Sequence, residues 1–325
     1  MSRVVKVAVV QAAPVMLDRM ATTEKVCRLI DEAGTAGARL ILFPEALIPP
    51  YPRGMSFGTA VGRRTDAGRR AYARYYENSV EVPGAVTDMI GAAARRNRTY
   101  VAIGVVERDT ARLGGTLYCT LLYFAPDGML LGKHRKLKPT AMERVIWGEG
   151  DGSTLTAVKT EFGTIGGLIC WENYMPLARM AMYGKGVDLY LAPTADARDS
   201  WQATIRHIAC EGRCFVLAAN QFVTRGMMPA GWETVSDGAD VACRGGSAIV
   251  SPLGEYLAEP LYDREGILTA ELNLDLIAEA RFDFDPIGHY NRPDVFRLIV
   301  NEAAQLAVEP AATSNELWET KTTDA

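Results

Sequence analysis

The chain has 325 residues, of which 48% are hydrophobic and 23% charged, with a formal net charge of -4 and a pI of about 5.6. This composition is ordinary for a globular protein with one large α/β core or two smaller ones. The acidic balance, without a basic stripe or an aromatic-and-basic motif, excludes nucleic acid as the expected partner.

The opening segment MSRVVKVAVVQAAP alternates like a strand and is too short for a signal peptide or a membrane span. Nothing later approaches the roughly 18 consecutive apolar residues of a membrane helix, so we expect no membrane partner and a cytoplasmic location. The histidines lack metal-ligand spacing, which predicts no metal site. Reduced thiols are expected because no C-x-x-C pair occurs among Cys27, Cys119, Cys170, Cys210, Cys214 and Cys243.

Apolar and β-branched runs predict strands, and helical spacing predicts helices between several of them. The predicted strands are Val4–Val10, Leu40–Phe43, Tyr100–Val106, Leu117–Ala125, Met129–Lys133, Ile165–Cys170, Val187–Ala192, Phe215–Asn220, Ser247–Ser251 and Ile267–Leu272. The predicted helices lie within residues 22–38, 84–97, 176–186 and 199–212. We expect a threonine cap near Glu24 for the first helix and a cap at Asp199 or Ser200 for the last.

Two tight turns, 126–128 and 252–254, each contain proline and glycine between apolar runs and predict hairpins. Helical units mixed with hairpins predict an α/β protein with mixed sheets. No linker marks a second domain, so residues 1–308 are predicted to form one domain. Residues 309–325 lose apolar periodicity and are predicted to form a C-terminal tail that is mobile or contacts a partner.

Glu45, in ARLILFPEALIPPYPRG, follows a predicted strand that Pro44 ends. Loops at strand C-termini carry much of the chemistry of α/β proteins. A solvated loop carboxylate is the ordinary alternative. The apolar neighbours of Glu45 instead favour a desolvated carboxylate, whose pKa rises from about 4.3 toward the range of a general base.

The segment LLGKHRKLKPT places a basic cluster after another predicted strand: Lys133, Arg135, Lys136 and Lys138. A solvated basic edge is the common explanation of such a cluster. Strand alternation puts Lys136 and Lys138 on the face of His134, opposite the other two cations. If that face points inward, the ammonium of Lys136 needs a buried partner, and Glu45 can provide it.

The segment GGLICWENYMPL places Cys170 between an apolar run and a predicted helix. Strand, sharp turn and helix are the pattern of a nucleophile elbow. The helix N-terminus and a nearby lysine are expected to lower the thiol pKa from about 8.5. The backbone N–H of Trp171 is then expected near negative charge that develops on a substrate. A buried structural cysteine explains the same run equally well.

A second arrangement would pair the thiol of Cys170 with His207 as its base. His207 lies in the middle of a predicted helix beside Ile208, where a packed or surface histidine is more common. This dyad is therefore the less favoured arrangement.

Glu45 in FPEALIPPYP, Lys136 in KHRKLKPT and Cys170 in CWENYMPL have the order, spacing and context of the nitrilase superfamily of carbon–nitrogen hydrolases. The chain resembles this family from VAVVQAAP to GHYNRPDVF. The resemblance implies a four-layer α-β-β-α sandwich. It also implies that Glu45 is the general base, Lys136 the cationic stabiliser and Cys170 the nucleophile.

Further residues match the family residue by residue. Glu143, in TAMERVIWGEGDGS, resembles the second glutamate that holds the lysine, while a surface carboxylate paired with Arg144 is the alternative. Positions that line the pockets of the family are matched by Tyr51, Trp147 and Thr194, and a packing role explains each of these three as well.

The sequence CWE, together with APTADARDSW and GHYNRPDVF, resembles the nitrilase branch, including its plant-like and related bacterial members. That resemblance implies hydrolysis of an organic nitrile by water to the carboxylic acid and ammonia. The expected intermediates are a covalent thioimidate and a thioester, with no cofactor. Asn173 replaces a histidine of many bacterial and cyanide-degrading relatives, which argues against cyanide as the main substrate. Family members commonly form dimers or spirals, so we expect a homo-oligomer.

An amidase or carbamoylase on the same scaffold, or a catalytically silent assembly module, are the alternative functions. The intact set of Glu45, Lys136 and Cys170 argues against a silent protein. A silent thiol is expected to react slowly with alkylating agents at neutral pH. Replacement of Lys136 by alanine is expected to reduce turnover without unfolding the protein.

Overall fold

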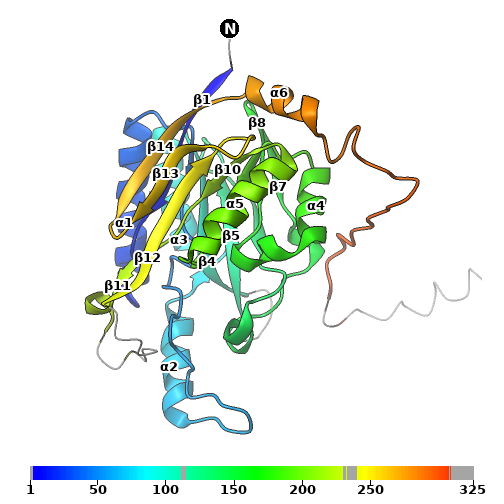
Figure 1. Cartoon of the computed structure of the whole chain (residues 1–325). Coiled ribbons are helices and arrows are strands. Elements are labelled where there is room, and N and C mark those ends of the chain that lie inside the picture. Colours follow the sequence, from blue (N-terminus) through cyan, green and yellow to red (C-terminus); the bar gives the residue numbers. More distant parts are fainter. Residues whose placement is uncertain (1–2, 111–114, 230–231, 233–239, 307, 309–325) are drawn as a thin grey trace, which may run out of the picture.

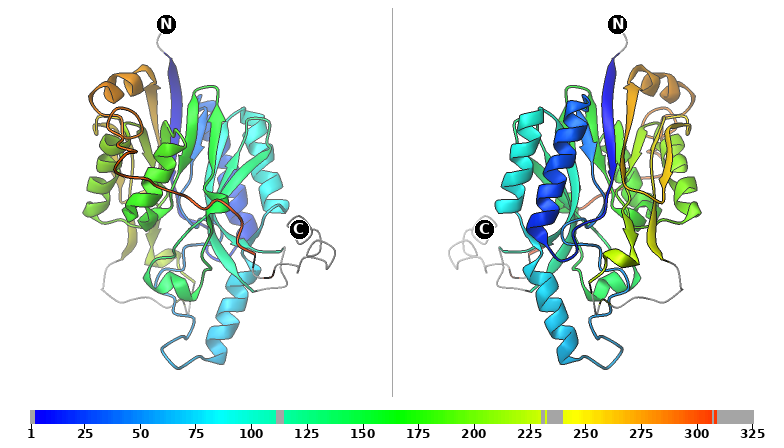
Figure 2. Two further views of the ribbon diagram at one scale, coloured as in Figure 1. Left: turned by 90° about the vertical axis from the view of Figure 1, so that its right-hand side faces the viewer. Right: turned by 90° about the vertical axis from the view of Figure 1, so that its left-hand side faces the viewer.

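Two β-sheets pack face to face, and helices cover both outer faces (Figures 1 and 2). The structure, a computed structural model, describes residues 3–110, 115–229, 232, 240–306 and 308. The order helix, sheet, sheet, helix confirms the expected four-layer α-β-β-α sandwich. Within the described ranges, no helix has the length and apolar character needed to cross a bilayer. The predicted tail, residues 309–325, lies outside the described residues.

The first sheet has the strand order β14-β1-β2-β4-β5-β6, with β3 paired to β4. Its strands are β1 (Val4–Gln11), β2 (Leu40–Leu42), β3 (Val80–Glu81), β4 (Tyr100–Arg108), β5 (Leu117–Phe124), β6 (Leu130–Arg135) and β14 (Gly266–Asn273). Strands β1, β2 and β4 are parallel, whereas β5, β6 and β14 pair antiparallel with their neighbours. The predicted hairpin at 126–128 joins β5 to β6.

The second sheet has the order β11-β12-β10-β9-β8-β7, with β13 paired to β12. Its strands are β7 (Ala157–Thr160), β8 (Gly163–Gly167), β9 (Leu189–Leu191), β10 (Phe215–Ala218), β11 (Phe222–Thr224), β12 (Val241–Val250) and β13 (Tyr256–Tyr262). Strands β8, β9 and β10 are parallel, and β12 is antiparallel to β10. The predicted hairpin at 252–254 joins β12 to β13.

Helices α1 (Arg19–Thr35) and α3 (Ala85–Asn97) cover the first sheet, while α4 (Pro176–Gly184) and α5 (Asp199–Gly212) cover the second. Figure 1 places α2 (Asp66–Glu77) and α6 (Asp275–Asp283) at opposite ends of the molecule. These two helices were not predicted, and each buries only two of its residues. Short 3₁₀ turns are η1 (Ala141–Val145), η2 (Gly152–Thr154), η3 (Cys170–Tyr174) and η4 (Arg225–Met227).

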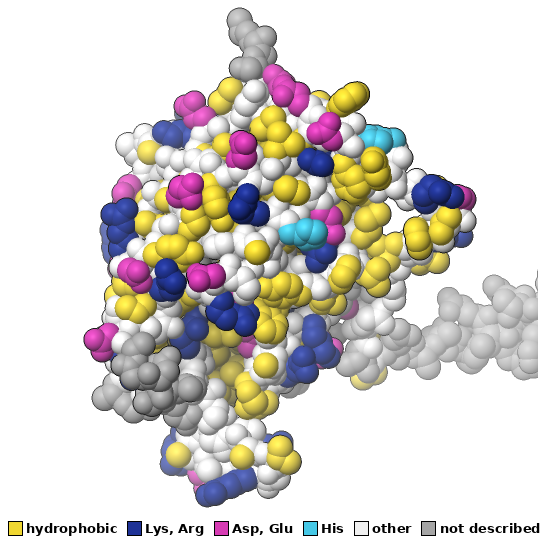
Figure 3. Space-filling view, viewed as in Figure 1, with side chains coloured by type: hydrophobic (Ala, Val, Ile, Leu, Met, Phe, Trp, Pro, Cys, Tyr) yellow, Lys and Arg dark blue, Asp and Glu magenta, His cyan; other side chains and the backbone are white. Residues whose placement is uncertain are grey.

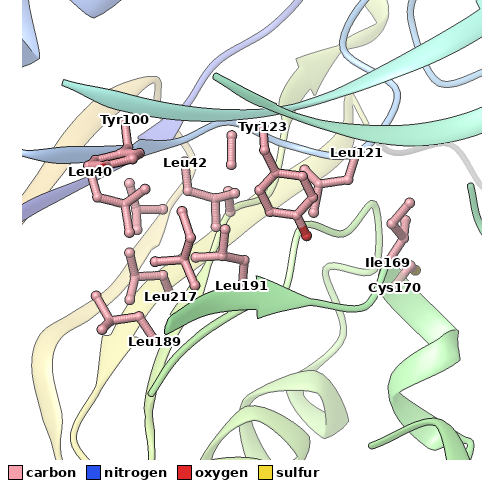
Figure 4. Close-up of a cluster of buried hydrophobic side chains, with 14 of the residues drawn as sticks. Leu40, Leu42, Tyr100, Leu121, Tyr123, Ile169, Cys170, Leu189, Leu191 and Leu217 are labelled. Atoms are coloured by element: carbon pink, nitrogen blue, oxygen red, sulfur yellow. The ribbon is translucent and has the colours of Figure 1, made fainter. Parts of the chain in front are cut away.

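Apolar side chains from the facing sheets fill the space between them (Figure 4). The first sheet contributes Leu40, Leu42, Tyr100, Leu121 and Tyr123, and the second contributes Leu189, Leu191 and Leu217. Full burial of one such leucine stabilises the fold by about 1.5–3 kcal/mol. Ile169 and Cys170 lie at one edge of this cluster, so the candidate nucleophile adjoins the core.

Three local expectations are wrong. Helix α1 begins at Arg19 with Asp18 as its cap, because the Asp18 carboxylate accepts the Ala21 N–H. The threonines near Glu24 lie inside the helix and donate their hydroxyls to backbone carbonyls one turn earlier. Helix α5 has Arg198 at its N-cap instead of Asp199 or Ser200. Strand β8 ends at Gly167, so Cys170 lies in the turn η3 and not in a strand.

Candidate active site

Glu45 lies in the loop after β2, and its side chain is fully buried. This loop crosses β4 closely, where the Gly104 N–H donates to the Pro44 carbonyl at 3.1 Å. From the loop after β10, the Gln221 amide donates to the carbonyls of Glu45 and Ala46 at 2.8 and 3.1 Å. Segments of both sheets therefore hold the backbone around this carboxylate.

Lys136 follows β6 and is also fully buried. Its Nζ donates to Glu45 Oε1 at 2.6 Å and to Glu143 Oε2 at 2.8 Å. Glu143 comes from η1, where Oε2 also accepts the Thr140 N–H at 2.7 Å. The structure thus brings Lys136 and Glu45 together and directs Glu143 inward to the ammonium instead of outward to Arg144.

Cys170 has a left-handed backbone with φ of 52°, which is uncommon for a residue with a side chain. Its N–H donates to the Pro193 carbonyl at 2.8 Å, and its Sγ accepts from Thr194 Oγ1 at 3.1 Å. The Asn173 amide donates to the carbonyls of Leu168 and Cys170 at 2.9 and 2.8 Å. These contacts hold a sharp elbow that directs the thiol toward Thr194.

Burial dominates the proton affinities of the site. Burial raises the pKa of Glu45, although the Lys136 ammonium opposes the shift. Burial also raises the pKa of the Cys170 thiol, and the Glu45 carboxylate raises it further, against Lys136. Burial alone would lower the pKa of Lys136, but Glu45, Cys170 and Glu143 raise it well above its ordinary value.

The expected lowering of the Cys170 pKa is therefore wrong. Helix α4 begins only at Pro176, so its N-terminus is separated from the thiol by η3. Two carboxylates near the sulfur outweigh the single ammonium, and the resting thiol is protonated.

The residues matched to family pockets touch the charged cluster directly. The Tyr51 hydroxyl donates to Glu143 Oε1 at 2.6 Å, and its ring meets the edge of Trp147 at a centroid distance of 5.7 Å. The Trp147 ring centroid lies 5.9 Å from Lys136 Nζ, within cation–π range. Together with the contact from Thr194 to the thiol, these side chains line the charged cluster.

Trp171 and Asn173 differ in their relation to the site. The Trp171 indole donates to Asp196 at 2.8 Å and stacks under Arg198 at 4.7 Å, at the protein surface. The Asn173 side chain is fully buried, and its Oδ1 accepts from Tyr190 at 2.8 Å. Because Asn173 supports the backbone of the elbow, its identity is a poor guide to the substrate.

The remaining candidates lie elsewhere. His207 is 64% exposed on α5 and lies 3.6 Å from Glu211, away from the buried thiol, so a Cys170–His207 dyad does not form. The cations Lys133 and Arg135 pair with buried Glu107 on the opposite face of β6, as alternation predicts. Lys138 was expected to share the face of Lys136, but β6 ends at Arg135 and Lys138 pairs with Glu149 at the surface.

Three further residues shape the site and were missed. Gln221 holds the loop that carries Glu45. In the sequence, only its place in the polar pair Asn220-Gln221 after the apolar run of β10 indicates such a role. Gly104 is required because a β-carbon there would lie 2.3 Å from the Pro44 carbonyl oxygen and 2.5 Å from Glu45 Cα. Cys119 places its thiol 3.5 Å from Glu45 Oε1. Nothing near positions 104 and 119 in the sequence marks either residue.

The assembled groups are a thiol, a carboxylate and an ammonium. Among the hydrogen bonds of the described residues, Glu45 Oε2 has no partner, so this oxygen is free to accept a proton. No three His, Cys, Asp or Glu side chains in the described ranges are placed to hold a metal ion. This set can add a sulfur nucleophile to an electrophilic carbon and move protons to the attached atoms.

Comparison with known proteins agrees with this chemistry. A family model described as carbon-nitrogen hydrolase matches residues 6–282. The chain is 55% identical over 305 residues to an aliphatic nitrilase of Sinorhizobium fredii, covering 93% of this chain and 97% of the relative. It is 49% identical over 318 residues to a bifunctional nitrilase/nitrile hydratase of Nicotiana tabacum, with coverages of 96% and 90%. A carbon-nitrogen hydrolase structure from Helicobacter pylori shares the fold, with a TM-score of 0.70 at 22% identity and coverages of 90% and 97%.

Proposed function

The chain belongs to the carbon–nitrogen hydrolase family, and we propose that it is a nitrilase that hydrolyses an organic nitrile to the carboxylic acid and ammonia. The observation that carries this function is the Lys136 ammonium held between Glu45 and Glu143 beside the Cys170 thiol. Identities of 55% and 49% to proteins named as nitrilases support a nitrile as the substrate.

In the first step, Glu45 takes the proton of the Cys170 thiol as the sulfur adds to the nitrile carbon. One C–N π bond breaks, and the electron pair moves to nitrogen. Lys136 and the backbone N–H of Trp171 are the donors proposed to stabilise that nitrogen until Glu45 passes it the thiol proton, which restores the Glu45 carboxylate. A preorganised donor of this kind is typically worth about 2.7–4 kcal/mol. The product of this step is a covalent thioimidate.

In the second step, water adds to the thioimidate carbon while Glu45 takes a proton from the water. The carbon–nitrogen bond of the tetrahedral intermediate then breaks, and the nitrogen leaves as ammonia. A thioester on Cys170 remains. A second water attacks this thioester with the same base, releases the carboxylic acid and returns the proton to sulfur.

The same tetrahedral intermediate allows a second outcome. If its carbon–sulfur bond breaks before its carbon–nitrogen bond, the thiol is restored and the amide is released. The Nicotiana relative is named a bifunctional nitrilase/nitrile hydratase, a name that covers both products. We therefore expect a minor amide fraction beside the acid.

An amidase or carbamoylase is not favoured, because the relatives at 55% and 49% identity are named for nitriles. A silent module is disfavoured by the complete buried cluster. Alkylation of Cys170 by a general reagent does not separate these cases. The raised pKa of this thiol makes the reaction slow even in an active enzyme, so a substrate-like electrophile is needed.

The test is ammonia release from a panel of nitriles and the corresponding amides, followed by intact-mass spectrometry with a slow nitrile. We expect an adduct with the mass of the intact nitrile, or of its acyl group, on the wild-type chain. Cys170→Ala should abolish the adduct, whereas Cys27→Ala, on half-buried α1, should retain it. Ammonia from amides alone, or an adduct that survives Cys170→Ala, would contradict the proposal.

We also propose that the enzyme is a cytoplasmic homo-oligomer. The cysteines of the described residues are free, which agrees with a reducing compartment. Large apolar side chains are exposed on and after α6, where Phe282, Phe296 and Ile299 are 84%, 75% and 76% exposed. Figure 3 shows apolar side chains interspersed with charged ones on this face, including the segment after α6 that loops out at the right. Light scattering should give a molar mass of at least twice the 35.4 kDa of one chain, and a monomer at micromolar concentration would contradict this proposal.

A further inference from the structure

A second buried ion pair lies behind the elbow and takes no part in the steps above. His134, in β6, and Glu172, in η3, both have fully buried side chains. His134 Nε2 lies 3.2 and 3.0 Å from Oε1 and Oε2 of Glu172. Burial of two charges costs free energy that their attraction often fails to recover, so stability alone does not explain the pair.

The Glu172 carboxylate also joins the two segments that carry the reactive groups. Its Oε1 accepts the N–H of Leu137, the residue after Lys136, at 2.6 Å. Its Oε2 accepts the N–H of Ile169, the residue before Cys170, at 2.7 Å. Both are short bonds to an ionised acceptor, which are stronger than neutral hydrogen bonds. One carboxylate therefore ties the lysine segment to the elbow.

His134 completes this link from β6. Its Nδ1 lies 3.0 Å from the Thr154 carbonyl oxygen, which can only accept a hydrogen bond. Its Nε2 faces carboxylate oxygens that each already accept a backbone N–H, as an ionised carboxylate does. Both ring nitrogens are therefore donors, and the ring is an imidazolium.

The charges around the pair agree with this state. Burial alone would lower the pKa of His134, but Glu172 raises it above its ordinary value. Burial raises the pKa of Tyr123 and of Tyr190, and the charge of Glu172 raises both further. Both tyrosines are thus neutral and leave His134 as the cation that balances Glu172.

We propose that Glu172 and His134 form a positioning pair that sets the place of the Lys136 ammonium relative to the Cys170 thiol. The inference rests on the proposed nitrilase function, in which the Cys170 sulfur adds to the nitrile carbon and the Lys136 ammonium stabilises the nitrile nitrogen. The imidazolium pairs with the Glu172 carboxylate, and that carboxylate accepts both backbone N–H groups at once. Loss of either partner should leave the residues of the cluster present but misplaced by a fraction of an ångström.

Misplacement of this kind affects the transition state more than substrate binding, because Lys136 acts on charge that develops during addition. We therefore expect kcat to fall by about 10-fold to 100-fold in Glu172→Gln and in His134→Gln, with KM nearly unchanged. The glutamine of Glu172→Gln keeps the shape but turns one end into a donor that faces a backbone N–H. The kcat of the double variant should be no lower than the kcat of the less active single variant, because the pair acts as a unit.

The matched control is His207→Gln, which makes the same replacement at an exposed histidine that also neighbours a glutamate. It should leave kcat and KM at wild-type values. Thermal denaturation accompanies each measurement, so a folded variant with low kcat separates positioning from loss of structure. Wild-type kcat in folded Glu172→Gln and His134→Gln would overturn the proposal.

A spectroscopic measurement keeps the test valid where a variant does not fold. The chain has three histidines, so nitrogen-15 labelling of histidine gives a spectrum simple enough to assign with His134→Gln and His207→Gln. At neutral pH the His134 signals should be those of an imidazolium, and a neutral ring would overturn the proposal. If the wild-type protein releases no ammonia from nitriles, the proposed function fails, while the spectrum still decides the state of the pair.

Discussion

The chemistry of single residues in this protein is governed by the burial of charge. Glu45 and Lys136 are fully buried, and Glu143 and Cys170 are 6% and 5% exposed. Lys136 compensates two carboxylates with one positive charge, so a negative charge is left in a region that solvates it poorly. Burial raises the proton affinity of the Glu45 carboxylate although Lys136 opposes the shift, and burial together with the Glu45 carboxylate keeps the neighbouring thiol from resting as a thiolate.

The first prediction concerns the pH dependence of catalysis. Glu45 must be ionised to act as a base, and its pKa is raised above the ordinary value of 4.5. The rate should therefore fall as pH decreases through that raised pKa, and the acid limb of kcat/KM should have its midpoint above 4.5. A midpoint at or below this value would contradict Glu45 as the base.

Glu45→Gln should remove turnover at every pH. It should not lower the Tm at neutral pH, because a group with a raised folded-state pKa loses stability when it ionises above that pKa. Thermal denaturation at pH 7 checks this sign, and a clear loss of Tm would show that the ionised carboxylate stabilises the fold.

The second prediction concerns Lys136→Met. Removal of the ammonium leaves buried carboxylates without compensation, and such a change typically costs about 3–5 kcal/mol. The expectation that Lys136 can be replaced without unfolding the protein stays a prediction, and the buried charges add a loss of stability to it. The loss should be largest at high pH, where Glu45 must be ionised, and smaller at low pH, where Glu45 is protonated.

Urea unfolding at pH 5 and pH 8 measures this difference. Lys138→Met is the matched control, since Lys138 pairs with Glu149 at the surface and such pairs are worth about 1 kcal/mol or less. Equal stability of Lys136→Met and wild type at pH 8 would mean that the buried charges are not coupled.

At the scale of secondary structure elements, the site depends on crossings between segments distant in the sequence. The loop after β2 passes over β4, the segment after β6 meets η3 through Glu172, and the loop after β10 returns to the Glu45 backbone. At the first crossing, a β-carbon on Gly104 would lie 2.3 Å from the Pro44 carbonyl oxygen. We therefore expect the small residue and the hydrogen bonds at these crossings to affect catalysis without any contact with substrate.

The third prediction tests one crossing through Gly104→Ala. The added methyl group would meet the backbone of Pro44 and Glu45, which cannot move as a flexible side chain does. Overpacking of this kind costs about 1–3 kcal/mol or more, and the displaced loop should also reduce kcat. Gly184→Ala is the control, because no atom lies within 4 Å of a β-carbon there. Unchanged kcat and Tm in Gly104→Ala would refute the close crossing.

At the scale of the whole molecule, the segment after α6 returns across the sandwich to the side of the lysine segment (Figure 2). The Gln305 N–H donates to Asp151 Oδ2 at 2.8 Å, and Glu302 pairs with Lys185 at 2.7 Å. The Asn301 carbonyl lies so close to Gly152 that a β-carbon there would be 2.0 Å away. This segment therefore spans from the end of α6 to the loop that follows Lys136.

The fourth prediction is that the two parts of the C-terminus differ in importance. Truncation after residue 308 should keep the Tm and kcat, in line with the proposed domain of residues 1–308. Truncation after residue 299 removes the contacts to Asp151, Gly152 and Lys185 and should lower the Tm by a few degrees, equivalent to roughly 1–2 kcal/mol. Circular dichroism melts measure both. Equal Tm values for the two truncated chains would show that the segment from residue 300 to 308 does not stabilise the sandwich.

Much of the architecture could be predicted from local patterns. Most strands and both hairpins were recognised because β-branched runs and turn residues act over a few neighbouring positions. The short strands β3, β7 and β11 were not predicted. Helices α2 and α6 were missed because they bury few side chains. The caps at Asp18 and Arg198 were misplaced because cap geometry depends on where the chain enters the helix.

The sequence by itself determined which reactive groups this protein carries, since the motifs around Glu45, Lys136 and Cys170 lie within short segments that can be read locally. Only the tertiary structure decided the proton affinities of these groups and the contacts that hold them in place. Burial and the excess of carboxylates raised the pKa of Cys170, against the expectation from a nearby helix and lysine. Gly104, Gln221 and the His134–Glu172 pair act across contacts between residues far apart in the chain. Desolvation and long-range contacts exist only after folding, so no local pattern could reveal them.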